Sequence, residues 1–195
     1  MNTISIIGAG SIGSAIARLL TGAGLEVKIA NSRGPSSLAG LVAELGPRAS
    51  AATAAEAARA DIVFLSVPWS RIASAVEGLG DWGGRIVVDT NNPIEAPAFK
   101  PFDLGGRASS EVVAGLLPGA RVVKAFNHLP PALLAQADGG QRVLFFSGED
   151  AGAKQDVAQL IERLGLFGID LGGVEGGKLA QFPGGPLPAL NLLKV

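Results

Sequence analysis

The sequence predicts an α/β fold built on a doubly wound, mainly parallel sheet. Three observations favour it: short β-type runs alternate with helical patterns, residues 61–67 are almost continuously apolar, and a glycine-rich turn follows the first run. A strand that is apolar along its length is typical of a parallel sheet covered by helices on both faces. The regular alternation of strands and helices is typical of doubly wound folds.

The elements can be assigned in chain order. The predicted strands are residues 3–7, 25–30, 49–51, 61–67, 85–89, 121–126, 142–147 and 167–171. The predicted helices are residues 11–23, 35–45, 54–58, 71–78 and 151–164. The first helix has one apolar face, formed by Ile12, Ala15, Ile16, Leu19 and Leu20. The second helix opens with Pro35 and Ser36, which is a typical start signal.

The C-terminal part of the sequence differs in composition from the rest. After the last predicted strand the chain is rich in glycine and proline, and Leu187, Leu190 and Leu193 could share one face of a helix. We therefore expect a main domain at residues 1–171, with extra C-terminal strands, and a small helical cap at residues 172–195. Exposed leucines in a row are unusual on a monomer, so we also expect a homodimer.

Composition excludes several classes of function. The chain has 16 basic and 17 acidic residues and a net charge of −1, which gives no reason to expect nucleic acid or an anionic membrane as a partner. It has no cysteine, no tyrosine and one histidine, so thiol chemistry, a Tyr/Lys reductase site and a Cys- or His-based metal site are not expected. The apolar start is interrupted by Arg18, and no run approaches the ~20 residues of a membrane span. We expect a cytoplasmic protein.

The strongest motif lies directly after the first predicted strand and opens the first predicted helix. It consists of Gly8, Ala9, Gly10, Ser11, Ile12 and Gly13. This G-x-G-x-x-G spacing predicts a Rossmann-type dinucleotide site. Gly8 permits the tight turn, Gly10 lets the backbone approach a pyrophosphate, and Gly13 lets the helix pack closely on the strand. The alternative is a glycine-rich turn that binds no ligand.

The tip of the second strand favours NADP over NAD. NAD sites place an acidic residue ~20 positions after the glycines, where it binds the ribose hydroxyls. This strand ends in Asn31, Ser32 and Arg33, and Glu26 lies too early to reach the ribose. A guanidinium and a hydroxyl suit a 2′-phosphate, which a carboxylate would repel. Alternatively, Arg33 is a solvated loop residue.

Two further strand ends belong to the predicted crevice, because the carboxyl ends of parallel strands face the ligand. The fourth strand ends at Val67, Pro68 and Trp69. Trp69 either walls the coenzyme or packs on the following helix. The fifth strand is followed by Asn91 and Asn92, which serve the nicotinamide side or form an Asn-Pro turn.

These motifs together resemble a known family. The segments GAGSIG, NSR, VPW and KAFNHLP, with GG and LAQ at 176–181 and the terminal GPLPALNLLK, are similar to the NADPH-dependent reductases of the deazaflavin coenzyme F420. The segment KAFN is also similar to the nucleotide domain of the ferric reductases of animal membranes. The resemblance covers almost the whole chain, and the combination of motifs is more specific than the glycine motif alone.

The resemblance implies where two cofactors would bind. NADP would lie on the glycine motif and on Ser32 and Arg33, with its nicotinamide near Pro68, Trp69 and Asn91. The deazaflavin ring of F420 would stack on the nicotinamide, near Asn127–Pro130 and the C-terminal segment. The implied acceptor pocket includes Leu129, Pro130, Gly184, Pro186 and Leu187. Few groups of this sequence are obvious partners for the acidic tail of F420.

Hydride transfer between two flat rings fits a chain that is poor in catalytic side chains. It requires the reacting carbons to be held about 3–3.5 Å apart and needs no nucleophile. His128 is the one polar candidate beside the acceptor, where it would position the ring. Alternatively, Asn127 or His128 caps the next helix. Lys124 is expected to be solvated.

Two other functions stay open at this stage. The chain could reduce a flavin or a small carbonyl compound with NADPH. It could also be a non-catalytic NADPH-binding module, in which the C-terminal segment fills the acceptor cleft.

Overall fold

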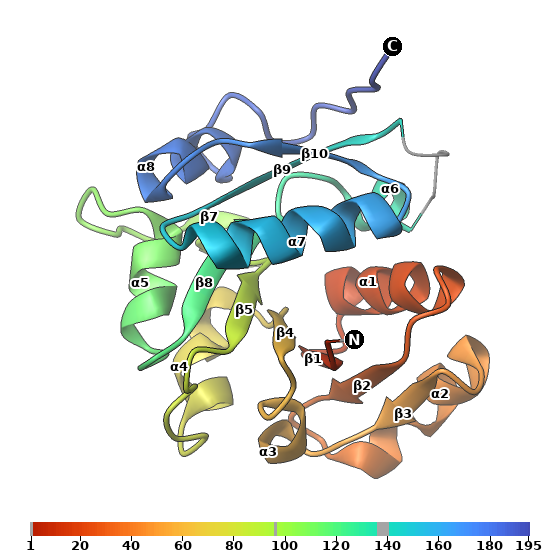
Figure 1. The fold of residues 1–195 in the computed structure, drawn as a ribbon. Coiled ribbons are helices and arrows are strands. Elements are labelled where there is room, and N and C mark those ends of the chain that lie inside the picture. Colours follow the sequence, from red (N-terminus) through yellow and green to blue (C-terminus); the bar gives the residue numbers. More distant parts are fainter. Residues whose placement is uncertain (1, 96, 136–140) are drawn as a thin grey trace.

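The computed structural model describes residues 2–95, 97–135 and 141–195, and it contains a central eight-stranded sheet (Figure 1). The strand order is β10-β9-β8-β5-β4-β1-β2-β3. The strands are β1 Ile4–Ile7, β2 Val27–Ala30, β3 Ala49–Ala51, β4 Ile62–Leu65, β5 Ile86–Asp89, β8 Arg121–Ala125, β9 Val143–Gly148 and β10 Phe167–Asp170. Neighbours are parallel except β8 and β9, so the predicted doubly wound, mainly parallel sheet is confirmed.

The first strand lies between β2 and β4, where the order of the sheet reverses. Ile6 of β1 is in register with Ile29 of β2 and with Phe64 of β4. β1 to β5 and β8 run in the same direction, so their carboxyl ends share one edge of the sheet. Ligands of open α/β sheets bind at this edge, next to the reversal of strand order.

Helices cover both faces of the sheet (Figure 1). One face packs against α1 Ser11–Gly22, α6 Pro131–Leu134 and α7 Ala151–Arg163. The other packs against α3 Ala54–Ala57, α4 Ile72–Val76 and α5 Ser109–Gly115. The short 3₁₀ helices η1 Pro35–Leu38 and η2 Trp69–Arg71 precede α2 Ala39–Leu45 and α4. Successive strand residues alternate between the two cores, as Ile6 and Ile7 do, which explains the continuously apolar strands.

A small hairpin, β6 Ile94–Glu95 with β7 Lys100–Pro101, and the short helix α5 lie near the carboxyl edge and were not predicted. A helix after β8 was expected, and α6 is that helix. α6 begins at Pro131 with Pro130 as its N-cap residue. The suggestion that Asn127 or His128 caps this helix is therefore wrong.

The C-terminal segment covers β9 and β10 on the face opposite α7. It contains α8 Val174–Gly177 and η3 Lys178–Ala180, so a small helical cap is confirmed. The expected helix through Leu187, Leu190 and Leu193 is wrong, because this part is irregular. Pro186 and Pro188 lack backbone N–H donors and disfavour a helix. Instead, Val143 N–H donates to the Leu192 carbonyl at 2.9 Å, so the segment lies along β9.

A buried ion pair joins β5 to β8. Lys124 Nζ lies 2.9 Å from Asp89 Oδ2, and the two side chains are 2% and 0% exposed. The ammonium also donates to the Asn91 carbonyl and to Ser109 Oγ. Burial lowers the pKa of Lys124, and the Asp89 carboxylate opposes that effect. The expectation that Lys124 is solvated is therefore wrong.

His128 is buried beneath the C-terminal segment. Its ring contacts Phe145 edge to face at 5.0 Å, and its carbonyl accepts the Ala189 N–H at 2.7 Å. Within the described residues neither ring nitrogen makes a regular hydrogen bond. Burial lowers the pKa of His128 to about 4, and the Val143 backbone opposes this only in part. The imidazole is therefore neutral at physiological pH.

We predict that Lys124→Met lowers the free energy of unfolding by about 3–5 kcal/mol, because the buried Asp89 carboxylate loses its partner. Urea unfolding measures this change. The double variant Lys124→Met/Asp89→Asn should recover most of the loss, since it leaves no buried charge. Arg18→Met breaks an exposed pair with Glu44 and should cost at most about 1 kcal/mol. A similar cost for Lys124→Met and Arg18→Met would contradict the prediction.

We also predict an acid-dependent loss of stability from His128. Its folded pKa lies below its unfolded value near 6.5, so the unfolded chain takes up a proton first as the pH falls. Stability is full above about pH 6.5 and decreases as the pH falls towards 4. Between about pH 7.5 and 5 the wild type should lose about 2 kcal/mol more than His128→Leu. Urea unfolding at the two pH values measures this difference. Equal losses of unfolding free energy in the wild type and in His128→Leu would refute the prediction.

Candidate functional site

The glycine turn after β1 makes two close backbone contacts. Gly8 has a φ of +112°, and its N–H donates to the Ala30 carbonyl at 2.8 Å. A Cβ at Gly8 would overlap the Ser66 carbonyl oxygen at the end of β4, and a Cβ at Gly13 would overlap the Gly8 carbonyl oxygen. The fold itself therefore requires glycine at these two positions.

Gly10 differs from both of these glycines. A Cβ built there would meet no other described part of the protein within 4 Å, and its φ of −79° suits any residue. Gly10 is the N-cap of α1, whose N-terminus receives no hydrogen bond from a described side chain and has no acidic residue in its first turn. The open space beside these backbone N–H groups fits a pyrophosphate, which a helix N-terminus attracts.

The tip of β2 presents one cation to solvent. Asn31 organises the turn: its Oδ1 accepts the Arg33 N–H at 3.0 Å, and its Nδ2 donates to Ser37 Oγ at 2.9 Å. Ser32 and Arg33 are exposed, and no described carboxylate pairs with the Arg33 guanidinium. Arg33 is thus available for an anion beside the glycine turn.

Asn91 braces the end of β4 against the end of β5. Its Nδ2 donates to the Leu65 carbonyl at 3.0 Å and to Asp89 Oδ1 at 2.9 Å, and its Oδ1 accepts the Val67 N–H at 3.1 Å. The amide is buried and both ends are used within the protein. Its position therefore fixes the turn that carries Val67, Pro68 and Trp69.

Trp69 lies half-buried at the start of η2. Its ring packs against Phe102, which follows β7, at a centroid distance of 6.5 Å and an angle of 46°. Pro68 beside it is exposed. The two aromatic rings form an apolar wall at the carboxyl edge of the sheet, and the sequence contained no signal for Phe102.

A pair of amides ties the C-terminal segment to β5 and β8. Asn127 Nδ2 donates to Asn92 Oδ1 at 3.1 Å and to the Ala180 carbonyl at 2.7 Å, while Asn92 Nδ2 donates to the Asn127 carbonyl at 2.8 Å. Asn92 Oδ1 also accepts the Phe182 N–H at 3.0 Å. Asn127 Oδ1 is buried without a hydrogen-bond partner in the described residues. We call this arrangement the amide clamp.

The structure brings most of the predicted residues to one edge. The glycine motif and the segments that begin at Asn31, Val67, Asn91 and Asn127 each follow the carboxyl end of one of five adjacent parallel strands. The predicted acceptor residues are more dispersed. Leu129 is buried and Pro130 is exposed, while Leu187 packs with Val143 and Phe145.

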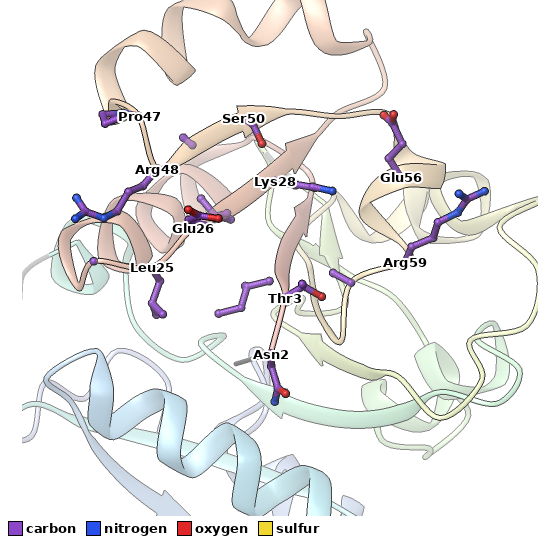
Figure 2. Close-up of a pocket in the computed structure, with 15 residues that line it drawn as sticks. Asn2, Thr3, Leu25, Glu26, Lys28, Pro47, Arg48, Ser50, Glu56 and Arg59 are labelled. Carbon is purple, nitrogen blue, oxygen red and sulfur yellow. The ribbon is translucent and has the colours of Figure 1, made fainter.

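Two pockets differ in their relation to this edge. A pocket of about 660 Å³ lies at the opposite, amino ends of β1, β2 and β3, and Figure 2 shows Glu26 among its lining residues. Glu26 is thus remote from the glycine turn, as the sequence predicted. A second pocket, of about 340 Å³, lies between the segment after β7 and the C-terminal segment. Its lining includes Gly184, Gln181 of the LAQ segment, and two residues that the sequence did not single out, Arg107 and Lys178.

The described residues contain no candidate for a membrane-spanning helix or for a metal-binding cluster. No helix among them is both long and apolar enough to cross a membrane. No group of three potential metal-ligating side chains occurs among them.

Comparison with solved structures identifies relatives at different distances. A hypothetical protein from Sinorhizobium meliloti is 52% identical, with a TM-score of 0.94 over 100% of this chain and 97% of that chain. A provisionally assigned F420-dependent NADP reductase from Arthrobacter sp. FB24 is 29% identical, with a TM-score of 0.74 over 90% of this chain and 86% of that one. No curated protein gives a significant match.

More distant structures share the fold alone. A reductive aminase from Aspergillus terreus, in complex with NADPH and ethyl 5-oxohexanoate, is 17% identical, with a TM-score of 0.67. The match covers 90% of this chain and 57% of that enzyme.

The sequence family gives the remaining comparison. Residues 3–93, from β1 to the turn after β5, match the model of the family described as NADP oxidoreductase, coenzyme F420-dependent. These residues contain the glycine turn, the tip of β2 and the brace at Asn91. Residues 3–93 are thus similar to that family, and the likeness to the Arthrobacter reductase extends over 90% of this chain.

Proposed function

We propose that this chain, an NADP-dependent oxidoreductase by its similarity to this family, transfers hydride between NADP(H) and a flat deazaflavin acceptor such as coenzyme F420. The observation that carries the proposal is the open backbone at Gly10, beside an uncapped helix N-terminus and near Arg33, with which no described carboxylate pairs. Packing within the protein explains why Gly8 and Gly13 are glycines, but it does not explain the glycine at position 10. A phosphate that must approach the backbone would require glycine there.

The residues of the glycine motif, with Asn31, Ser32 and Arg33, would hold the phosphates and the adenosine ribose. Arg33 would bind a 2′-phosphate with two N–H groups, and Asn31 would hold the turn that presents it. Val67, Pro68 and Trp69 would border the nicotinamide, in a position fixed by the Asn91 brace. In this arrangement residues 1–171 bind the coenzyme, and residues 172–195 complete the acceptor side.

The bound coenzyme supplies the hydride, so the protein needs mainly to align two rings and exclude water. Trp69 and Phe102 would provide an apolar wall for this purpose. Asn127 Oδ1, buried without a partner among the described residues, suits an N–H donor of one of the two ligands. His128 would act through packing alone, because burial keeps its pKa near 4 and its ring neutral.

Two further properties belong to this proposal. Leu190, Leu192 and Leu193 are 42%, 41% and 54% exposed and would form a contact between two copies of the chain, giving a homodimer. The protein would act in the cytoplasm on a small-molecule redox partner.

The proposed function is tested by following NADPH oxidation at 340 nm with F420, with a flavin and with a small carbonyl compound in turn. We expect rapid oxidation with F420 only. Activity with only the flavin, or with only the carbonyl compound, would identify that compound as the acceptor in place of F420. Binding of NADPH without oxidation by any of the three would instead identify a non-catalytic module.

We predict that Gly10→Ala weakens NADPH binding by about tenfold or more, because its methyl group would occupy the space of the pyrophosphate. Stability should change by less than about 1 kcal/mol, since no described atom contacts the added group. The matched control is Gly22→Ala in the same helix, which is exposed and should leave affinity unchanged. Titration of NADPH fluorescence measures both variants. Equal affinities in the two would refute the phosphate site.

We predict that Arg33→Ala weakens NADPH binding by ~1.5–3 kcal/mol and NADH binding little, because only NADPH carries the 2′-phosphate. Lys28→Ala, which removes an exposed cation near the amino end of the same strand, β2, controls for general charge effects. Calorimetric titration with both coenzymes separates the two effects. An equal loss of NADPH and NADH affinity would disprove the assignment of Arg33.

A further inference from the structure

We propose that the 340 Å³ pocket between the segment after β7 and the C-terminal segment binds the anionic side chain of the acceptor. This inference rests on the proposed function, and it assigns the recognised group as a phosphate or carboxylate. We call this pocket the anion pocket. Its lining comprises Phe102, Asp103, Leu104, Gly106, Arg107, Lys178, Gln181, Pro183, Gly184 and Gly185.

The anion pocket is joined directly to the carboxyl edge of the sheet. Phe102, which lines it, packs against Trp69 and donates its N–H to the Pro93 carbonyl at 2.9 Å. On the other side, Phe182 between two lining residues is held to the amide clamp. A molecule whose ring lay at the nicotinamide side of Trp69 could therefore extend its side chain past Phe102 into this pocket.

The charge of the anion pocket favours an anion. Arg107 is exposed, its Nε reaches only the Leu104 carbonyl at 3.4 Å, and no described carboxylate pairs with it. Lys178 Nζ donates to the Gly106 carbonyl at 3.0 Å and lies 2.8 Å from Glu175, which is not part of the lining. Asp103 is the lining carboxylate, and its Oδ1 accepts the Gly105 N–H at 2.9 Å. Arg107 is thus the lining cation left free for an incoming ligand.

The backbone around the anion pocket leaves room for such a group. Gly106 and Gly184 have φ values of +79° and +105°, and a Cβ at either would meet no other described atom within 4 Å. At Gly185 a Cβ would overlap the carbonyl oxygens of Lys178 and Leu179, so glycine is needed there for packing. Glycines from both walls keep the pocket open beside Arg107, whose planar guanidinium binds phosphate and carboxylate with two N–H groups.

The test compares ligands that differ only in the side chain. Coenzyme F420 carries a phosphate and carboxylates, and 8-hydroxy-5-deazariboflavin has the same ring system without them. FMN and riboflavin form a second pair that differs in the phosphate alone. Equilibrium binding to the NADP⁺ complex, measured by fluorescence quenching, gives affinities without requiring turnover.

We predict that Arg107→Gln weakens F420 binding by about tenfold or more and leaves 8-hydroxy-5-deazariboflavin and NADP⁺ unchanged. Arg107→Lys should recover part of the loss, since it keeps the charge. Arg48→Gln, an exposed arginine of the opposite pocket, is the control for general charge. If Arg107→Gln also weakens the binding of FMN but not of riboflavin, the phosphate is the recognised group. If it weakens the binding of F420 alone, the carboxylates are the recognised group.

The outcomes separate this inference from the proposed function. If wild-type protein binds both deazaflavins equally well, or Arg107→Gln weakens both equally, the anion pocket is refuted and the acceptor assignment stands. If wild-type protein binds neither deazaflavin, the proposed acceptor itself is wrong.

Discussion

The close approach of Gly8 to the end of β4 is the constraint on which the rest of the site depends. The turn can pass the Ser66 carbonyl only because Gly8 lacks a side chain, and α1 can begin where it does only because Gly13 leaves room for the Gly8 carbonyl. These two contacts place the N-terminus of α1 over the carboxyl edge of the sheet. The one glycine of the motif that the fold does not require, Gly10, then lies in open space beside that N-terminus.

The other side of the edge is held by polar bonds in the interior. The buried Asp89–Lys124 pair positions Asn91, and Asn91 in turn holds the backbone of Val67. Backbone contacts of glycine fix the side proposed for the phosphates, whereas a charged network fixes the side proposed for the nicotinamide. Burying these charged groups costs desolvation free energy. The network therefore serves mainly to hold Asn91 and the strand ends in one geometry, and less to stabilise the fold.

The sequence was most informative where a single residue type or a regular period determines the structure. The position of the glycine turn, the buried apolar strands and the acid-free tip of β2 could all be predicted in this way. The hairpin β6–β7 was missed because strands of two residues show no period. Lys124 was misjudged because Asp89, 35 positions away, becomes its partner only when β5 and β8 pair. The lining of the anion pocket comes from separate loops, and Arg107 lies in no motif.

The amide clamp holds the C-terminal segment by its main chain. Asn92 and Asn127 bind the Ala180 carbonyl and the Phe182 N–H, and no side chain of the segment takes part in these bonds. Lys178 and Gln181 add side-chain bonds to Gly106 and Ser109, but the clamp itself does not depend on the side chains of the segment. If this segment forms the proposed acceptor side, substitutions at its other side chains would change the electron partner and leave the clamp and the coenzyme half as they are.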